Sequence, residues 1–273
     1  MRANRANRYG TTLFDNEFMT AARTLPAPLA GYKPEAKGTV GPELGIGFTL
    51  GAYTTEPVMT LKSCTGDRAL GWDLLPPGSA RTEFTQNNVT YINAGYHDSP
   101  QRWVKGTTPK PISWYAGVQY DGDMFRASKV LEDLPTFYPG ATCYEVAGFF
   151  WWQGDRDSRD MEMSRLYEAN LVQLIKQLRL QYNSPSAKFV AASLGQTAQG
   201  AKDGGGLILD AMENVANATK YPEFKGSVAA VYTHPLEHSP GSSGGHYGKD
   251  AQTYMNVGAA MGDAMIGLLK GSE

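Results

Sequence analysis

The alternation of short apolar runs with longer segments of helical periodicity constrains the fold of this chain more than any other feature. Four apolar runs have the length of buried strands, at residues 57–61, 144–150, 188–193 and 227–232. Helical patterns lie between or after them, at residues 43–52, 125–134, 160–182, 206–218 and 250–269. Strands that alternate with helices in this way form a mostly parallel sheet with helices on both faces. We therefore expect an α/β fold, a three-layer α/β/α sandwich.

The chain length suits a single domain with one long insertion. A chain of 273 residues can bury an ordinary core, so we expect one domain over 1–273. Residues 1–40 lack a strand-like apolar run and are expected to form an N-terminal extension. Residues 79–140 are rich in Thr, Asn, Gly, Pro and aromatic residues, and so long a connection is usually functional. Two interpretations stay open, namely exposed rings that stack on sugars and a satellite core beneath a loop.

Charge and composition exclude several classes of partner. The formal net charge is -2 and no basic stripe is visible, so the sequence favours neither nucleic acid nor an anionic membrane. No apolar run is long enough to cross a bilayer, and the first ten residues lack the apolar core of a secretory signal. A trimmed export product would look the same, so the compartment and the oligomeric state stay open. The expected partner is small and neutral or polar.

The cysteines give no sign of a metal centre or a disulfide framework. Cys64 and Cys143 are too few and too far apart for either pattern. We expect two buried thiols, and we expect neither a metal nor a cofactor.

The segment 146–157 carries the most specific chemical signal. A buried strand ends abruptly in the sequence Trp-Trp-Gln-Gly-Asp-Arg-Asp, and in open α/β sheets ligands bind at the carboxyl ends of strands. Gln153 can donate through its amide toward an oxyanion, and Asp155 or Asp157 can orient a histidine. The alternative is that these residues cap the following helix, as Asp157, Ser158 and Asp160 could do.

Two further segments supply a candidate base and a candidate oxyanion donor. His246 follows a glycine- and serine-rich stretch just before a helix, where it could reach a site as a general base. The alternative is a structural histidine. Gly66 follows the apolar run at 57–61, and its backbone N–H could face a substrate because no Cβ blocks the approach.

The order of these pieces resembles the family of carbohydrate acetylesterases that includes the sialate O-acetylesterases. The resemblance rests on Trp-x-Gln-Gly-x-x-Asp after a strand, on Gly66 in the preceding turn, and on His246-Tyr247 followed by Tyr254 and Gly258. It runs from about residue 41 to residue 269 and is strongest at 144–157 and 246–265. It implies the flavodoxin-like, mostly parallel sheet of the SGNH hydrolases and the removal of acetyl groups from sialic acid or xylan-type carbohydrate, in an exported or periplasmic setting.

The resemblance also implies roles for single residues. His246 would be the catalytic base, Gly66 an oxyanion donor, and Gln153 the side chain that replaces the oxyanion asparagine of related hydrolases. The acid that supports the histidine is open among Asp155, Asp157 and Glu237, because Ser243 occupies the position three residues before His246. The family often has a histidine where this chain has Trp152 and a glycine where it has Asp67. The expected substrate-binding residues are Asp67, Trp72, Trp151, Trp152 and Asp157.

The serine nucleophile of that family is missing from the sequence. It sits in a Gly-Gln-Ser-Asn motif after the first strand, and no such motif occurs in these 273 residues. We weigh three explanations: a sequence that begins too late, a non-catalytic carbohydrate-binding relative, and another hydroxyl such as Thr197 in Gly-Gln-Thr. We favour the first, because the remaining site residues are preserved. With strand order 2-1-3-4-5 the absent strand would be the central one, so we expect a rearranged sheet, a borrowed N-terminal strand or low stability.

Two rival functions remain beside ester hydrolysis. The first is a binding module that holds a glycan on Trp72, Trp151, Trp152 and the aromatic residues of 79–140 without cleaving it. The second is a flavin- or nucleotide-binding α/β protein, which would need a phosphate-cradling glycine turn. The glycines at 204–206 lack the spacing of such a turn.

Overall fold

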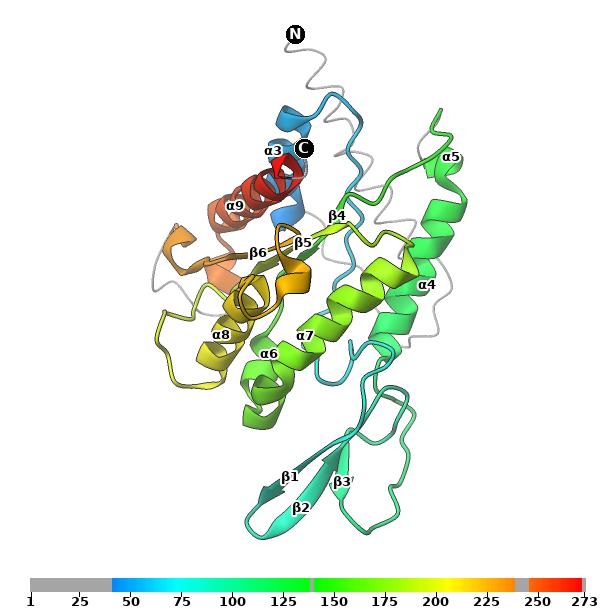
Figure 1. Ribbon diagram of the computed structural model, residues 1–273, viewed down its shortest axis with the longest axis vertical. Helices are drawn as coiled ribbons and strands as arrows, with labels where there is room; N and C mark the ends of the chain where they lie inside the picture. Colours follow the sequence, from blue (N-terminus) through cyan, green and yellow to red (C-terminus); the bar gives the residue numbers. More distant parts are fainter. Residues whose placement is uncertain (1–40, 138–139, 239–245, 272–273) are drawn as a thin grey trace.

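The computed structural model describes residues 41–137, 140–238 and 246–271, and its centre is a parallel sheet between two layers of helices (Figure 1). The sheet contains β4 (Gly148–Trp151), β5 (Lys188–Ala192) and β6 (Val228–Val231) in the order β4-β5-β6. The α/β class is therefore confirmed for the described part of the chain, with three parallel strands.

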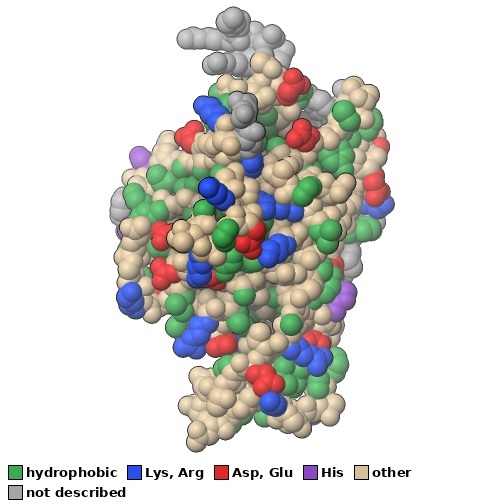
Figure 2. Space-filling view, viewed as in Figure 1, with side chains coloured by type: hydrophobic (Ala, Val, Ile, Leu, Met, Phe, Trp, Pro, Cys, Tyr) green, Lys and Arg blue, Asp and Glu red, His purple; other side chains and the backbone are tan. Residues whose placement is uncertain are grey.

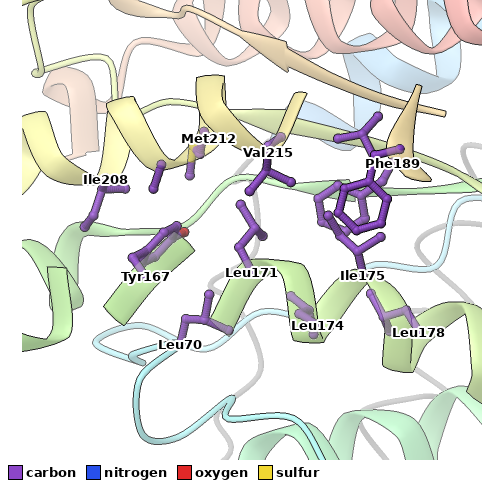
Figure 3. Packing of buried hydrophobic residues seen from close by; sticks show 14 of the residues in the cluster. Leu70, Tyr167, Leu171, Leu174, Ile175, Leu178, Phe189, Ile208, Met212 and Val215 are labelled. Carbon is purple, nitrogen blue, oxygen red and sulfur yellow. The ribbon is translucent and has the colours of Figure 1, made fainter. Parts of the chain in front are cut away.

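The sheet is buried on both faces because β5 alternates its side chains between two cores. Phe189 and Ala191 point toward α7 (Met161–Gln181) and α8 (Gly204–Ala216). Val190 and Ala192 point toward α3 (Pro42–Tyr53) and α9 (Ala251–Lys270). Figure 3 shows the first of these cores, in which Tyr167, Leu171 and Ile175 of α7 face Ile208, Met212 and Val215 of α8.

Residues 79–140, the predicted insertion, contain a small antiparallel sheet. Its strands are β1 (Thr82–Gln86), β2 (Val89–Asn93) and β3 (Arg102–Val104). Asn87 and Asn88 connect β1 to β2, and both have positive φ, as a two-residue hairpin turn of type I′ requires. A satellite core joins this sheet to the main body through Trp72, Trp103, Ala116 and Met163 of α7. Several aromatic residues therefore serve as packing beneath the insertion.

The remaining elements are short apart from one long helix. They are α4 (Val118–Glu132), α5 (Leu134–Phe137), α6 (Asp155–Ser158), η1 (Pro222–Phe224), η2 (His234–Leu236) and η3 (His246–Lys249). The helix predicted at 125–134 begins seven residues earlier than expected, at Val118. The other four predicted helices agree with α3, α7, α8 and α9 to within two residues at each end.

The strand predicted at 57–61 is wrong. These residues are extended but pair with no strand in the part of the chain that the structure describes. A strand needs a neighbour for its backbone N–H and C=O groups, and β4 likewise pairs within the described residues only with β5. The strand predicted from residue 144 begins only at Gly148, where β5 supplies a partner.

The prediction of two buried thiols is also wrong. Cys64 is half-buried and Cys143 is exposed, and neither is in a disulfide among the described residues. Both lie in segments that belong to neither a strand nor a helix, so the core does not enclose their side chains.

Charged side chains of both signs lie on the surface. On the face shown in Figure 2, Lys and Arg are interspersed with Asp and Glu. Among the described helices, none has the length and apolar character needed to cross a membrane.

Candidate active site

Polar and aromatic residues gather where the parallel strands end. Gln153 follows β4, Gly195 follows β5, and Glu237 follows β6 after η2. Carboxyl ends of parallel strands lie at one edge of a sheet, and ligands of open α/β sheets bind there. We call residues 66–71 with Gln153 and Asp157 the turn side of this site. The histidine side comprises Trp152, Gly195, Glu237, His246, Tyr247 and Tyr254.

On the turn side, a buried carboxylate ties the turn to the end of β4. Asp157 has no exposed surface. Its Oδ1 accepts from the N–H of Gly71 at 2.8 Å, and its Oδ2 accepts from the N–H of Leu70 at 2.9 Å. The Gln153 amide donates to the same Oδ2 at 2.6 Å. Asp157 therefore holds the turn, whereas the predicted capping role falls to Asp160, which caps α7.

The Gln153 side chain is hydrogen-bonded at both of its ends. Besides its bond to Asp157, Nε2 donates to the backbone oxygen of Arg68 at 2.8 Å. The hydroxyl of Tyr167 lies 3.0 Å from Gln153 Oε1 and accepts from Trp151 Nε1 at 2.9 Å. An amide nitrogen carries two hydrogens, and both are engaged here. Donation from Gln153 to an oxyanion therefore requires one of these bonds to be replaced.

Burial sets the electrostatics of the turn side. Removal from water raises the pKa of Asp157 to about 6, although hydrogen bonds from Gln153, Gly71 and Leu70 oppose the rise. Burial also raises the pKa of Tyr167 well above its usual value, with a contribution from the Asp157 charge. Tyr167 thus stays a neutral hydroxyl that can bond to Gln153.

The Gly66 end of the turn is open to solvent. Gly66 is exposed, and a Cβ built on it would meet nothing within 4 Å. Its N–H has no hydrogen-bond partner among the described residues. The next residue, Asp67, has a positive φ of 57° and pairs with Arg159 at 3.3 Å. A backbone donor is therefore available where the sequence predicts one.

On the histidine side, Tyr247 organises the ends of β4 and β5. Its hydroxyl accepts from the N–H of Gly195 at 3.1 Å and lies 3.1 Å from Gln196 Oε1. Its ring stacks on Trp152 with centroids 5.5 Å apart. Burial raises the pKa of Tyr247 to about 12. His246 begins η3 immediately before it, but the imidazole lies outside what the structure describes.

The three candidate acids have different environments. The Asp157 carboxylate accepts hydrogen bonds from the backbone of the turn. Asp155 is exposed and forms an ion pair with Arg159. Glu237 is half-buried, and its Oε1 is buried with no hydrogen-bond partner among the described residues. Glu237 lies near Gly195 and contributes to the electrostatics of Tyr247, as does Asp155.

The predicted tryptophans occupy different places. Trp72 is only 8% exposed and belongs to the satellite core. Trp151 is half-buried and packs against the main core. Trp152 is half-buried at the strand ends, where its Nε1 donates to the Ser193 backbone oxygen at 2.8 Å. Of the three, Trp152 lies on the histidine side.

The alternative hydroxyl, Thr197, faces away from this arrangement. Its side chain is 6% exposed and its Oγ1 lies against Gly205 in the first turn of α8. A small cavity lies between the insertion and α7, where Gly71 of the turn side contributes to its lining together with Asn93, Gln101 and Met163.

Sequence reasoning assigned no role to Tyr167 or to Tyr247. Tyr167 belongs to the apolar stripe of α7, where periodicity alone predicts core packing. Tyr247 has a positive φ of 52°, which is uncommon for a residue with a large side chain. Its position in a histidine–tyrosine pair after a glycine-rich stretch was the available signal.

One comparison with known proteins identifies the family. The class defined so far is an α/β protein with a polar site at the ends of parallel strands. The family model described as carbohydrate esterase, sialic acid-specific acetylesterase, matches residues 98–267, which is more than half of the chain. The chain belongs to this carbohydrate esterase family.

Other comparisons are less close. An X-ray structure of a protein from Arabidopsis thaliana matches with 17% identity and a TM-score of 0.39. The match covers 54% of this chain and 52% of the plant protein, so the chain spans about half the length of that protein. No curated protein matches the chain.

Proposed function

We propose that this chain acts as a carbohydrate O-acetylesterase of the serine-hydrolase type, on acetylated sialic acid or xylan-type sugars. Family membership supports the reaction class. Two observations support the proposal: the Gly66 N–H has no hydrogen-bond partner among the described residues, and the histidine side around Tyr247 lies where β4 and β5 end. The Gly66 N–H can donate a hydrogen bond to an oxyanion, and the histidine side contains the predicted base.

The proposed reaction has two steps. The nucleophile is a hydroxyl, and these 273 residues do not supply it in a Gly-Gln-Ser-Asn motif. It attacks the acetyl carbonyl carbon while His246 takes its proton, and the carbonyl oxygen becomes an oxyanion near the Gly66 N–H. His246 then returns the proton to the sugar oxygen, which leaves as an alcohol. Water, deprotonated by the same imidazole, then attacks the acetyl-enzyme. The bond between the acetyl carbon and the enzyme oxygen breaks, the imidazolium returns its proton to that oxygen, and acetate leaves. No metal or cofactor takes part.

Among the acids, we propose Glu237 as the partner of His246. Its buried Oε1 has no donor in the described part of the chain, and a buried oxygen without a donor is costly. Asp155 and Asp157 are already paired with Arg159 and with the turn. We propose Asp67 and Trp152 as substrate contacts, because Trp72 and Trp151 pack in or against the cores and Asp157 is fully buried. We also propose a single domain with residues 79–140 as its insertion.

The test is acetate release from O-acetylated sialic acid, O-acetylated xylo-oligosaccharide and p-nitrophenyl acetate. We expect turnover that is lost in His246→Ala and retained in His238→Ala, a matched control whose exposed imidazole pairs with Asp250 at 3.0 Å. Equal loss in both variants would refute the role of His246. Glu237→Gln should lower turnover more than a hundredfold if the carboxylate orients the histidine.

The absence of a Gly-Gln-Ser-Asn motif favours a second candidate, a carbohydrate-binding relative without catalysis. Calorimetric titration with the acetylated sugars separates the two. Binding without acetate release in the wild-type chain, undiminished in His246→Ala, supports the binding module and refutes the esterase.

A further inference from the structure

Four consecutive residues of the turn have a backbone group held by a side chain. The Gln153 amide binds the oxygen of Arg68, and Asp73 accepts from the N–H of Ala69 at 2.9 Å. Asp157 accepts from the N–H groups of Leu70 and Gly71. Gly66 and Asp67 lie just before these anchored residues and are exposed.

Residues 68–71 are also held by close packing. The Leu70 side chain is fully buried and enters the main core near Tyr167 and Leu171 (Figure 3). At Gly71, an added Cβ would lie 3.3 Å from Asp157 Oδ1 and 3.3 Å from Met163 Cγ. The turn therefore has little freedom to move relative to α6 and α7.

From these contacts we propose that Asp157 and Gln153 are positioning residues, which fix the turn so that the Gly66 N–H is held where an oxyanion forms. This role rests on the proposed function, and it differs from direct donation by Gln153 because both amide hydrogens already bind the turn and Asp157. An oxyanion donor is effective only if it is preorganised. A displacement of about 1 Å can cost about a hundredfold in rate.

Asp157→Asn tests the proposal with little change in size. One carboxylate oxygen becomes an NH2 group, which faces N–H donors and cannot accept from them. We expect amide hydrogen exchange across residues 66–74 to become about tenfold faster. In the hydrolysis assay we expect kcat to fall by about tenfold to a hundredfold with little change in KM, since the oxyanion exists only in the transition state.

Matched controls separate positioning from a general loss of stability. Asp203→Asn changes a helix cap on α8, and asparagine also caps helices, so exchange at 66–74 and kcat should stay as in the wild type. Gly71→Ala provides a milder disturbance in case Asp157→Asn folds poorly, and it should lower kcat by less. Its control is Gly267→Ala, where the added Cβ meets nothing within 4 Å.

The exchange and kinetic measurements have separate outcomes. Unchanged exchange at 66–74 in both Asp157→Asn and Gly71→Ala overturns the proposal, as does a rise in KM with kcat unchanged. Faster exchange at 66–74 together with a selective fall in kcat supports it. If the wild-type chain releases no acetate, the proposed function fails and the catalytic role of the turn fails with it. Exchange then still decides whether Asp157 restrains the turn.

Discussion

The two sides of the candidate site are held by different kinds of interaction. On the turn side, a fully buried carboxylate and an amide bind backbone groups at short distances. On the histidine side, aromatic stacking between Trp152 and Tyr247 and one tyrosine hydroxyl hold the loops. The first arrangement depends on charge and hydrogen bonds, and the second depends mainly on ring packing. The two sides should therefore respond differently to pH and to loss of single polar atoms.

The largest effect should come from the strand that supports both sides. Phe189 of β5 is fully buried in the main core. Phe189→Ala should lower the free energy of unfolding by ~3–5 kcal/mol, because it removes buried apolar surface and leaves a cavity. Urea denaturation followed by tryptophan fluorescence measures this. Hydrogen exchange should rise on the turn side and the histidine side together, and a rise on one side only would contradict a shared support.

Changes in pH should act on the turn side through Asp157. Its pKa is raised by burial from 3.8 to about 6, so the folded state binds the proton more tightly than the unfolded state. The stability that protonation contributes is complete below about pH 4 and is lost as pH rises through about 6, by an amount on the order of 3 kcal/mol. Between pH 4 and pH 7, the unfolding free energy of the wild type should fall relative to that of Asp157→Asn. A constant difference would contradict the raised pKa.

This pH dependence has a consequence for the site. The ionised carboxylate is the form that accepts all three N–H groups, yet it is the form that burial disfavours. The turn is therefore held at a cost in stability, which is a common property of preorganised sites.

A smaller effect should follow from loss of the Tyr167 hydroxyl. Tyr167→Phe removes the hydroxyl that bonds to Gln153 and Trp151, and it leaves Gln153 Oε1 and Trp151 Nε1, which are half-buried, without this partner. We expect a loss of ~1–3 kcal/mol in unfolding free energy. Exchange should rise near Gln153 and at 66–74 but stay unchanged at 246–250. A rise at 246–250 would show that the sides are coupled.

The matching change on the histidine side should cost less. Tyr247→Phe keeps the ring that stacks on Trp152 and removes the hydroxyl that binds Gly195 and Gln196. The expected loss is ~1 kcal/mol, because Gln196 is exposed and can bond to water instead. Thermal denaturation measures the loss. A loss larger than that of Tyr167→Phe would mean that the hydroxyl, and not the ring, is the main support of this side.

The smallest effect is expected at the exposed pair above the turn. Asp67 and Arg159 have side chains that are 66% and 58% exposed, and such pairs contribute little in water. Asp67→Asn should leave the unfolding free energy within ~0.5 kcal/mol of the wild type. Denaturation at low and high salt is the measurement, and a large salt-dependent loss would assign Asp67 a part in holding the turn.

The sequence by itself determined the helices α3, α7, α8 and α9 and the strands β5 and β6. The stripe that includes Leu171, Leu174 and Ile175 repeats at helical spacing, and it faces the core because that spacing puts its members on one side of α7. The run at 188–193 is apolar throughout because β5 is covered on both faces. Family membership could also be predicted, because the residues around Gln153 and His246 are local patterns.

Only the tertiary structure decided the contacts that join distant segments. Asp157 binds residues 86 and 87 positions away, and Tyr247 binds Gly195 across 52 positions. Whether a carboxylate caps its own helix or holds a remote turn depends on which backbone donors the fold brings to it. For the same reason the apolar run at 57–61 forms no strand in the described structure. Strand formation requires a neighbouring chain segment, and local sequence does not specify one.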